Sequence, residues 1–335
     1  MNTAPVPTTA RPLLPRFVNI VQSPSSQVSV TQELTASLLK PDASLSPKFF
    51  YDALGSKLFE AITLLDEYYP TRTEAIIFEA NNASIARAVE DSGIKSACLI
   101  DLGAGNCAKA AAFIPHLKPS QYVPVDISVD FMRDAAMQVQ ASFPTLSIVG
   151  VGMDFSSALT LPDSVQHHDR VFFYPGSSLG NFSPSDALRF LQQIVDAKQG
   201  NASGLLLGVD LVKDTAVLEA AYDDAAGVTA AFNKNVLLNI NAQLGADFDL
   251  RQWKHIALFN VAQSRIEMHL EAIANTTVRW LGYERSFNIG ERIHTENSYK
   301  YSLAGMTALL KKAGFSQVQH WTDTNGWFGV FWASR

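Results

Sequence analysis

The stretch Asp101-Leu102-Gly103-Ala104-Gly105-Asn106-Cys107-Ala108 joins a short apolar run, residues 97–102, to a segment with helical periodicity, residues 107–117. Glycines let the backbone turn tightly and approach a ligand closely. The first turn of a helix adds backbone N–H groups that have no partner within the helix. The stretch therefore predicts a strand, a ligand-binding turn and a helix, in that order.

Two carboxylates follow the neighbouring apolar runs. Asp126 closes the run 122–125 and lies 21 residues after Gly105, and Asp154 comes after the run 146–151. A carboxylate at the end of the second strand can accept hydrogen bonds from both ribose hydroxyls of a nucleotide. Each carboxylate taken alone also fits a solvated cap at a strand end. Three in succession, counting the one in the glycine stretch, favour a nucleotide site.

Short apolar runs alternate with helical segments through the middle of the chain. The runs cover residues 97–102, 122–125, 146–151, 170–174 and 205–209. Nearly continuous apolar runs are typical of buried parallel strands in a sheet with helices on both faces. Ligands bind such sheets at the carboxyl ends of the strands. The predicted fold class is therefore α/β, with a doubly wound, Rossmann-like domain that carries the glycine turn.

The alternation stops after residue 210. The remaining predicted elements are helices over 31–40, 49–63, 215–244 and 306–313, and extended segments over 264–271, 276–284, 286–300, 316–321 and 328–332, the last two as an antiparallel pair. A chain of 335 residues has room for slightly more than two domains. We therefore expect three parts. They are a disordered tail (1–30), a smaller α+β domain (31–70 plus 213–298) and the sheet domain (71–212 plus 299–335).

Acidic side chains outnumber basic ones: Lys and Arg number 26 and Asp and Glu 32, for a net charge of −6. Such a chain lacks the basic surface that holds a phosphate backbone, so no nucleic-acid partner is expected. No apolar run approaches the ~18 residues of a membrane span, and the start lacks the apolar region of a signal peptide. Cys98 and Cys107 fit a reducing compartment, and the histidines lack metal-ligand spacing. We expect a cytoplasmic monomer with a small-molecule substrate, no membrane and no metal.

Two cofactors fit the glycine stretch. Gly103-x-Gly105-x-x-Ala108 matches the fingerprint of a dinucleotide site, with alanine in the third position. An acidic residue two positions before the first glycine is instead similar to motif I of class I S-adenosylmethionine (SAM) methyltransferases. Gly152-Met153-Asp154-Phe155 resembles the adenine motif of the same class, in which the carboxylate accepts a hydrogen bond from the adenine amino group. Asp126 and Asp154-Phe155 at successive strand ends favour SAM.

Five further segments are more specific: FYDALGS (50–56), EYYPTRTE (67–74), GSSLGN (176–181), DLVKD (210–214) and AYDDAAGVT (221–229). From about Leu45 to the carboxyl terminus, the chain closely resembles the histidine-specific N-alpha-methyltransferases of ergothioneine biosynthesis. The resemblance implies a class I methyltransferase domain joined to a second domain that holds the amino acid. It also implies the first step of that pathway. In that step three methyl groups pass from SAM, as co-substrate, to the α-amino group of L-histidine, through mono- and dimethyl intermediates, giving hercynine (N-alpha-trimethylhistidine).

The resemblance assigns roles residue by residue. The positions implied to bind SAM are Gly103, Gly105, Lys109, Asp126, Asp154 and Phe155. The positions implied to bind the amino acid are Phe59, Tyr68, Gly176, Asn181, Tyr222, Met268, Glu296 and Ser298. Asn181 and Tyr222 are the implied catalytic residues, which hold the carboxylate and the amine. Tyr68, Glu296 and Ser298 are implied to recognise the imidazole, because a carboxylate facing a ring N–H makes a charge-assisted hydrogen bond.

Other interpretations remain open. Taken singly, Tyr68, Tyr222 and Met268 are residue types that also fill protein cores. An N-methyltransferase for another aromatic amino acid, such as tryptophan, would be expected to lack the imidazole-reading carboxylate of Glu296. The glycine stretch alone fits an NAD-dependent oxidoreductase. The motifs together also fit a non-catalytic regulator that senses SAM or histidine.

Besides Cys107 and Ala108, which stand where the family has more polar residues, the chain departs from the family pattern at three positions. Ala104 and Asn106 stand in and after the glycine turn, where Ser or Thr is usual, and Pro175 constrains the loop before Gly176. We expect the contacts with SAM and substrate to differ in detail from those of the family. None of the three positions is assigned to the chemistry.

Overall fold

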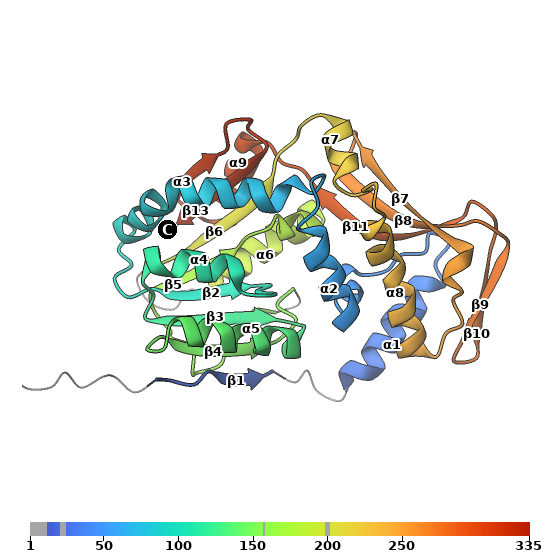
Figure 1. Ribbon diagram of the computed structural model, residues 1–335, viewed down its shortest axis with the longest axis horizontal. Coiled ribbons are helices and arrows are strands. Elements are labelled where there is room, and N and C mark those ends of the chain that lie inside the picture. The colour runs from blue at the N-terminus through green and yellow to red at the C-terminus, as the bar shows by residue number, and fades with distance from the viewer. Residues whose placement is uncertain (1–11, 21–24, 157, 198–201) are drawn as a thin grey trace, which may run out of the picture.

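The computed structural model describes residues 12–20, 25–156, 158–197 and 202–335 (Figure 1). Within these residues, one sheet contains eight strands in the order β1-β4-β3-β2-β5-β6-β13-β12. The five predicted parallel strands are β2 (Cys98–Leu102), β3 (Gln121–Asp126), β4 (Ser147–Gly152), β5 (Arg170–Tyr174) and β6 (Ser203–Asp210). They pair in parallel with one another, so the doubly wound α/β class is confirmed.

The composition of β2 shows why these runs form central strands. All five of its residues are buried. Successive side chains of a strand point to opposite faces of the sheet. Cys98 and Ile100 therefore join the core under α6 and α9, whereas Leu99 joins the core under α3, α4 and α5. These helices are α3 (Tyr69–Asp91), α4 (Ala108–Leu117), α5 (Val129–Ser142), α6 (Pro184–Asp196) and α9 (Leu303–Ala313).

The end of the chain completes the sheet as predicted. β13 (Phe328–Ser334) pairs antiparallel with β12 (Gln317–Thr322) on one side and with β6 on the other. Within the described ranges, no helix combines the length and the apolar character that crossing a membrane requires. Cys98 and Cys107 are buried free thiols.

The prediction of a disordered tail over residues 1–30 is wrong for two segments. β1 (Arg16–Asn19) pairs in parallel with β4 and forms an edge of the large sheet, and α1 (Ser25–Leu38) begins inside the predicted tail. The edge of β4 offers backbone groups for pairing, and Phe17 adds an apolar side chain that packs against the core. Residues 1–11 and 21–24 of the predicted tail lie outside the described residues.

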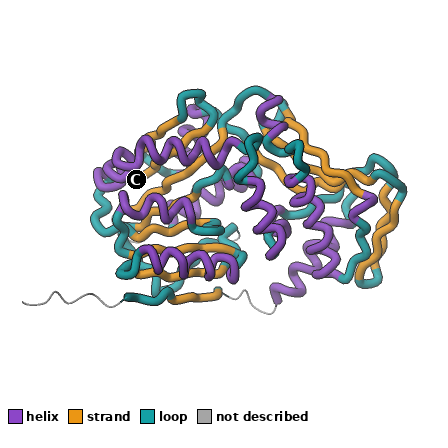
Figure 2. The backbone as a smooth tube through the Cα atoms, viewed as in Figure 1, coloured by secondary structure: helices purple, strands orange, loops and turns teal. Residues whose placement is uncertain are grey.

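A second group of elements surrounds an apolar core of its own. Besides α1, these elements are α2 (Ala53–Ile62), α7 (Thr215–Ala220), α8 (Val228–Leu244), β7 (Trp253–Asn260), β8 (Arg265–Ala272), β9 (Thr276–Trp280), β10 (Tyr283–Phe287) and β11 (Arg292–Tyr299). Strands β11, β8 and β7 form an antiparallel sheet, in that order. In Figure 2, helices α2 and α8 lie between the large sheet and the hairpin of β9 and β10.

The strands of this second group differ from the prediction. β7, the antiparallel neighbour of β8, is not predicted from the sequence. The extended segment predicted over 276–284 is instead the hairpin of β9 and β10. Its turn has positive φ at Leu281 (47°) and Gly282 (82°), as a two-residue type I′ hairpin turn requires.

The single helix predicted over 215–244 is divided into α7 and α8. The Asp214 side chain caps α7 by accepting from the backbone N–H of Ala216. The Asp224 carboxylate accepts from the backbone N–H groups of Val228 and Thr229, at 2.9 and 2.7 Å. Because each helix has its own amino-terminal cap, the chain between them leaves the helical path.

Candidate active site

A cavity of about 500 Å³, counting its opening to solvent, is lined by residues that follow β5 and by residues of the second group of elements. All eight residues predicted to bind the amino acid line this cavity: Phe59, Tyr68, Gly176, Asn181, Tyr222, Met268, Glu296 and Ser298. The fold therefore brings together positions from Phe59 to Ser298 of the sequence.

Three segments supply four of the polar side chains of the cavity. Asn181 ends the short 3₁₀ helix that follows β5, and Tyr222 lies in the break between α7 and α8. Glu296 and Ser298 are two residues apart on β11, so both side chains point to the same face of that strand. The break between the two helices is thus the feature that brings Tyr222 to the cavity.

Aromatic side chains form one wall of the cavity. The rings of Phe59 and Tyr68 meet edge to face, as do those of Tyr68 and Tyr222, each pair with centroids 6.2 Å apart. Tyr51 and Phe232 extend the wall, with centroids 5.8 Å apart. Edge-to-face packing holds each ring in one orientation. The faces of such rings attract a cation by about 0.5–2 kcal/mol.

Tyr222 is held at both ends. Its carbonyl oxygen accepts from Nε2 of His255 at 2.8 Å, and its hydroxyl donates to the Ser298 hydroxyl oxygen at 2.7 Å. Burial raises the pKa of the Tyr222 hydroxyl well above its ordinary value, so the group stays protonated. Tyr222 therefore enters the cavity as a neutral hydrogen-bonding group.

Glu296 is a buried carboxylate at the polar end of the cavity. Strand β11 pairs with β8, and a register shift between His294 and Glu296 places Glu296 opposite Met268 of β8. The side-chain amide of Asn181 donates to Oε1 of Glu296 at 3.0 Å. Burial raises the pKa of Glu296 to about 7, although the Lys300 ammonium and the Asn181 amide act in the opposite direction. Near neutral pH this carboxylate can therefore exist in either protonation state.

The glycine turn lies next to Asp126, as predicted. Gly103 and Gly105 have φ of 70° and 52°, a backbone conformation that glycine adopts without a steric penalty. The Gly105 N–H donates to Oδ2 of Asp126 at 2.9 Å, and the Ser128 N–H donates to Oδ1 at 2.8 Å. Burial raises the pKa of Asp126, and these two hydrogen bonds partly oppose the rise.

Two further cofactor candidates lie at the next strand end. Oδ1 of Asp154 accepts from the backbone N–H of Ser156 at 3.0 Å. The Phe155 ring meets Tyr174 edge to face, with centroids 5.8 Å apart, and a Cβ added to Gly103 would lie 3.8 Å from Phe155. A glycine turn, a carboxylate for the ribose and an aromatic ring for the base fit the adenosine part of SAM.

Lys109 differs from the other cofactor candidates, because its ammonium is engaged by a buried carboxylate. Nζ of Lys109 lies 2.5 Å from Oε2 of Glu74, and Oε1 of Glu74 accepts from the backbone N–H of Gly176 at 2.8 Å. Lys109 belongs to the helix after the glycine turn, and Gly176 lines the cavity. Glu74 therefore connects the two parts of the site.

Residues 30–335 match the protein family described as histidine-specific methyltransferase, SAM-dependent. The chain belongs to this family. The sequence resemblance stated above is thereby confirmed.

Three relatives of this histidine-specific methyltransferase illustrate the match. The histidine N-alpha-methyltransferase of Mycolicibacterium smegmatis is 39% identical over 325 residues, which cover 95% of this chain and 99% of the relative. The enzyme of the same name from Mycobacterium tuberculosis is 37% identical, over 93% of this chain and 96% of the relative. Ergothioneine biosynthesis protein 1 of Neurospora crassa is 29% identical, over 89% of this chain and 34% of that longer protein.

Several residues of the methyltransferase site are not predicted from the sequence. The additional residues that line the cavity are Tyr51, Ile62, Ser177, Ser178, Ala221, Thr229 and Phe232. Most of them lie within or beside the segments that carry the resemblance, as Tyr51 does in FYDALGS. Ile62 is an exception, because an isoleucine in a helical segment carries no local signal that separates a cavity wall from a core.

Proposed function

We propose that the protein is a histidine N-alpha-methyltransferase. It transfers three methyl groups from SAM to the α-amino group of L-histidine and gives hercynine, the first step of ergothioneine biosynthesis. The observation that carries the proposal is the cavity. Eight residues assigned from the sequence resemblance line one cavity beside a glycine turn. Family membership and the names of the relatives support the same substrate and methyl donor.

The SAM end of the proposed site is the carboxyl edge of β2, β3 and β4. The candidates are Gly103, Gly105, Lys109, Asp126, Asp154 and Phe155. Asp126 would hold the ribose hydroxyls, and Asp154 with Phe155 would bind the adenine. Lys109 acts beside them through its ion pair with Glu74.

The chemical step is a displacement at the methyl carbon of a sulfonium. The amine lone pair forms the N–C bond, the C–S bond breaks, and its electron pair stays on the sulfur of S-adenosylhomocysteine. A proton must leave the nitrogen before each of the three transfers. The enzyme therefore has to align a neutral amine and exclude water, which Asn181 and Tyr222 do by holding the carboxylate and the amine.

The aromatic wall fits the change of charge during the three rounds. The product nitrogen carries a permanent positive charge, and in this proposal it lies beside Tyr222, whose ring is part of the aromatic wall. Aromatic faces stabilise such a charge by cation–π attraction, without competing for the methyl group. At the far end of the substrate, Glu296 accepts a hydrogen bond from the imidazole N–H.

The domain roles and the cellular setting belong to the same proposal. Residues 31–70 plus 213–298 form the substrate-binding domain, and residues 71–212 plus 299–335 form the SAM domain. The two groups of buried side chains around separate cores support this division. We place the enzyme in the cytoplasm as a monomer that acts on a small molecule without a metal. The free thiols of Cys98 and Cys107 suit a reducing compartment.

Incubation with SAM and each of the twenty amino acids, followed by mass spectrometry, tests the proposed function. The expected result is a gain of three methyl masses on histidine and little or none on tryptophan. Trimethylation of tryptophan, or no methylation of any amino acid, would contradict it. Calorimetric titration with S-adenosylhomocysteine and with NAD separates a methyltransferase from an oxidoreductase.

A further inference from the structure

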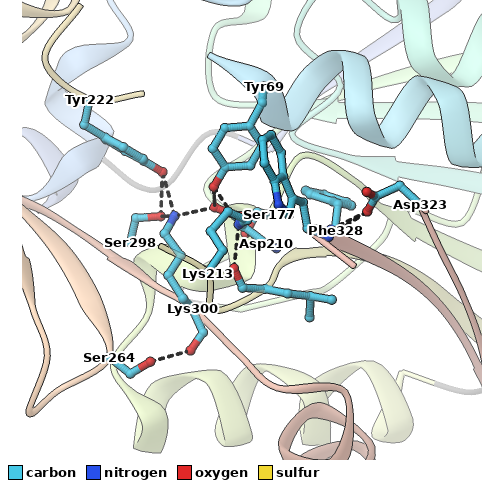
Figure 3. A network of polar contacts seen from close by, with 12 residues as sticks. Tyr69, Ser177, Asp210, Lys213, Tyr222, Ser264, Ser298, Lys300, Asp323 and Phe328 are labelled. Atoms are coloured by element: carbon cyan, nitrogen blue, oxygen red, sulfur yellow. Dashed lines mark hydrogen bonds and ion pairs between the residues drawn. The ribbon is translucent and has the colours of Figure 1, made fainter. Parts of the chain in front are cut away.

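The Lys300 side chain reaches Tyr222 and Ser298, two residues that line the cavity (Figure 3). Its ammonium is completely buried and lies 2.8 Å from Oδ2 of Asp210. It also donates to the Ser298 hydroxyl oxygen at 2.8 Å and to the Tyr222 hydroxyl oxygen at 3.0 Å. An ammonium has three N–H donors, so all three are used. Two of the three acceptors belong to residues that line the cavity.

The Lys300 backbone is also held in place. The Lys300 N–H donates to the carbonyl oxygen of Ser264 at 2.8 Å. The Ser264 hydroxyl donates to the Lys300 carbonyl oxygen at 2.9 Å. Figure 3 shows the side chain running from this anchor toward Tyr222 and Ser298. The ammonium is therefore positioned by contacts at both ends of the residue.

The hydrogen bonds among Lys300, Ser298 and Tyr222 determine whether each hydroxyl can still donate or accept a hydrogen bond from a ligand. The Ser298 oxygen accepts from both Lys300 and Tyr222. A serine hydroxyl has two acceptor lone pairs and one hydrogen, so Ser298 can only donate to a further partner. The Tyr222 hydroxyl has given its hydrogen to Ser298 and accepted one from Lys300, so it can still accept one hydrogen bond. The pair presents one donor and one acceptor to the cavity.

We propose that Lys300 is a positioning residue that sets the hydrogen-bond polarity of Ser298 and Tyr222, and thereby the selectivity for imidazole. The proposal rests on the proposed function. A neutral imidazole has one N–H donor and one bare nitrogen acceptor. Glu296 accepts from the first and Ser298 donates to the second. Tyr222 accepts from the substrate amine, which leaves the nitrogen lone pair free to point at the methyl group.

This arrangement explains why other aromatic amino acids are rejected as well as why histidine is bound. An aromatic amino acid that lacks the bare nitrogen leaves the Ser298 hydrogen unpaired in a buried site. One that lacks the N–H leaves the Glu296 carboxylate unpaired. Sites built on such hydrogen bonds discriminate strongly, because the unpaired polar group is costly.

Lys213 is a matched control for Lys300. It pairs with the same carboxylate, at 2.5 Å from Oδ1 of Asp210, and its side chain is also buried. Its other described hydrogen bonds go to the Tyr69 hydroxyl at 2.7 Å and to the Leu211 carbonyl oxygen at 2.5 Å. None of these three partners lines the cavity. Replacing either lysine removes one cation from Asp210, but only Lys300 contacts the hydroxyls that face the substrate.

The test compares Lys300→Met with Lys213→Met in steady-state kinetics. For Lys300→Met we expect kcat/KM for histidine to fall roughly 30-fold or more, and the ratio of kcat/KM for histidine to that for tryptophan to shrink. S-adenosylhomocysteine binding should stay within threefold of the wild type. Lys213→Met should keep the selectivity ratio. In the Lys300→Met background, adding Ser298→Ala should cause little further loss of kcat/KM for histidine, because Ser298 has already lost its hydrogen bond from Lys300.

Several outcomes would overturn the positioning role. They are unchanged selectivity in Lys300→Met, equal losses in the two lysine variants, or losses from Lys300→Met and Ser298→Ala that multiply independently. If Lys300→Met no longer binds S-adenosylhomocysteine, Lys300→Gln, which can still donate to Asp210, is judged by the same criteria. If wild-type protein fails to methylate histidine, the proposed function is contradicted as well. Wild-type activity with an unaffected Lys300→Met contradicts only the role of Lys300.

Discussion

Glu296 is assigned to substrate binding, and its burial lowers the stability of the folded protein when the carboxylate is ionised. Its pKa is raised to about 7 by burial, from an ordinary value of 4.5. The folded protein therefore holds this proton more tightly than the unfolded chain does. The contribution of Glu296 to the free energy of unfolding accordingly falls as the pH rises from about 4.5 to about 7. Above that range, the folded protein carries an unfavourable buried charge that a bound imidazole can compensate.

Glu296→Gln should therefore stabilise the ligand-free protein and weaken substrate binding. At pH 8 we expect the free energy of unfolding to rise by about 1–3 kcal/mol, and at pH 5 to change much less. The KM for histidine should rise tenfold or more, with S-adenosylhomocysteine affinity nearly unchanged. Thermal unfolding at both pH values and steady-state kinetics provide the measurements. A loss of stability at pH 8 would mean that the carboxylate is structural.

Asn181 is the residue whose removal should affect turnover most. Its amide holds Glu296 and is assigned to the substrate carboxylate and amine. For Asn181→Ala we expect kcat/KM for histidine to fall by about 10–150-fold, mainly through kcat, because the amine loses its alignment. Single-turnover rates at saturating histidine and SAM measure this directly. A near-normal rate would remove Asn181 from the mechanism.

At the scale of elements, Glu74 ties α3 to the helix after the glycine turn and to the loop after β5. Its side chain is buried, whereas that of Lys109 is 37% exposed. A partly exposed ion pair contributes little. The hydrogen bond from the partly buried Gly176 N–H to the buried Glu74 carboxylate therefore matters more than the charge of Lys109.

Glu74→Ala and Glu74→Gln distinguish these two contributions. Glu74→Ala leaves the Gly176 N–H without its partner, and we expect it to lower the free energy of unfolding by about 1–3 kcal/mol. Glu74→Gln keeps an acceptor oxygen and should lose less. We expect the KM values for histidine and SAM to rise together in Glu74→Ala, because the residue contacts both parts of the site. Equal stability of Glu74→Ala and the wild type would contradict this account.

The elements differ in how well the sequence predicts them. The parallel strands are predictable because both faces of each strand are apolar, as in β2. The edge strand β1 is not, because its pairing partner β4 lies far along the chain and the segment around it is rich in Pro and Ser. The break at Tyr222 is hidden in a stretch whose alanines favour a helix, and only the capping hydrogen bonds of Asp224 reveal it.

The residues of the candidate site also differ in how far the sequence predicts them. Some belong to sequence motifs, and others depend on contacts between distant parts of the chain. The resemblance names the residues that line the cavity, and their grouping follows from the fold. Lys300 carries no local signal, and Glu74, although it ends the segment EYYPTRTE, carries none for its contacts, because the partners of both residues lie far away in the sequence. The Gly176 N–H is 102 positions from Glu74, and the Tyr222 hydroxyl is 78 positions from Lys300. Such pairings depend on the tertiary structure and not on any sequence motif.

For the whole molecule, the fold shows where the few charged residues are placed. Charged residues make up 17% of the chain. Several of those that are buried lie at the carboxyl edge of the sheet or around the cavity: Glu74, Asp101, Asp126, Asp210, Glu296 and Lys300. These buried charged side chains therefore help to arrange the site between the two cores. Water does not screen their electrostatic interactions there.

The central claim is that this site methylates the α-nitrogen of histidine three times. The most direct measurement is the amount of S-adenosylhomocysteine released per histidine consumed, with the methylated atom located by fragmentation mass spectrometry. We predict three equivalents and a product with all three methyl groups on the α-nitrogen. Release of a single equivalent, methylation of the imidazole ring, or S-adenosylhomocysteine formed without a histidine product would contradict the account.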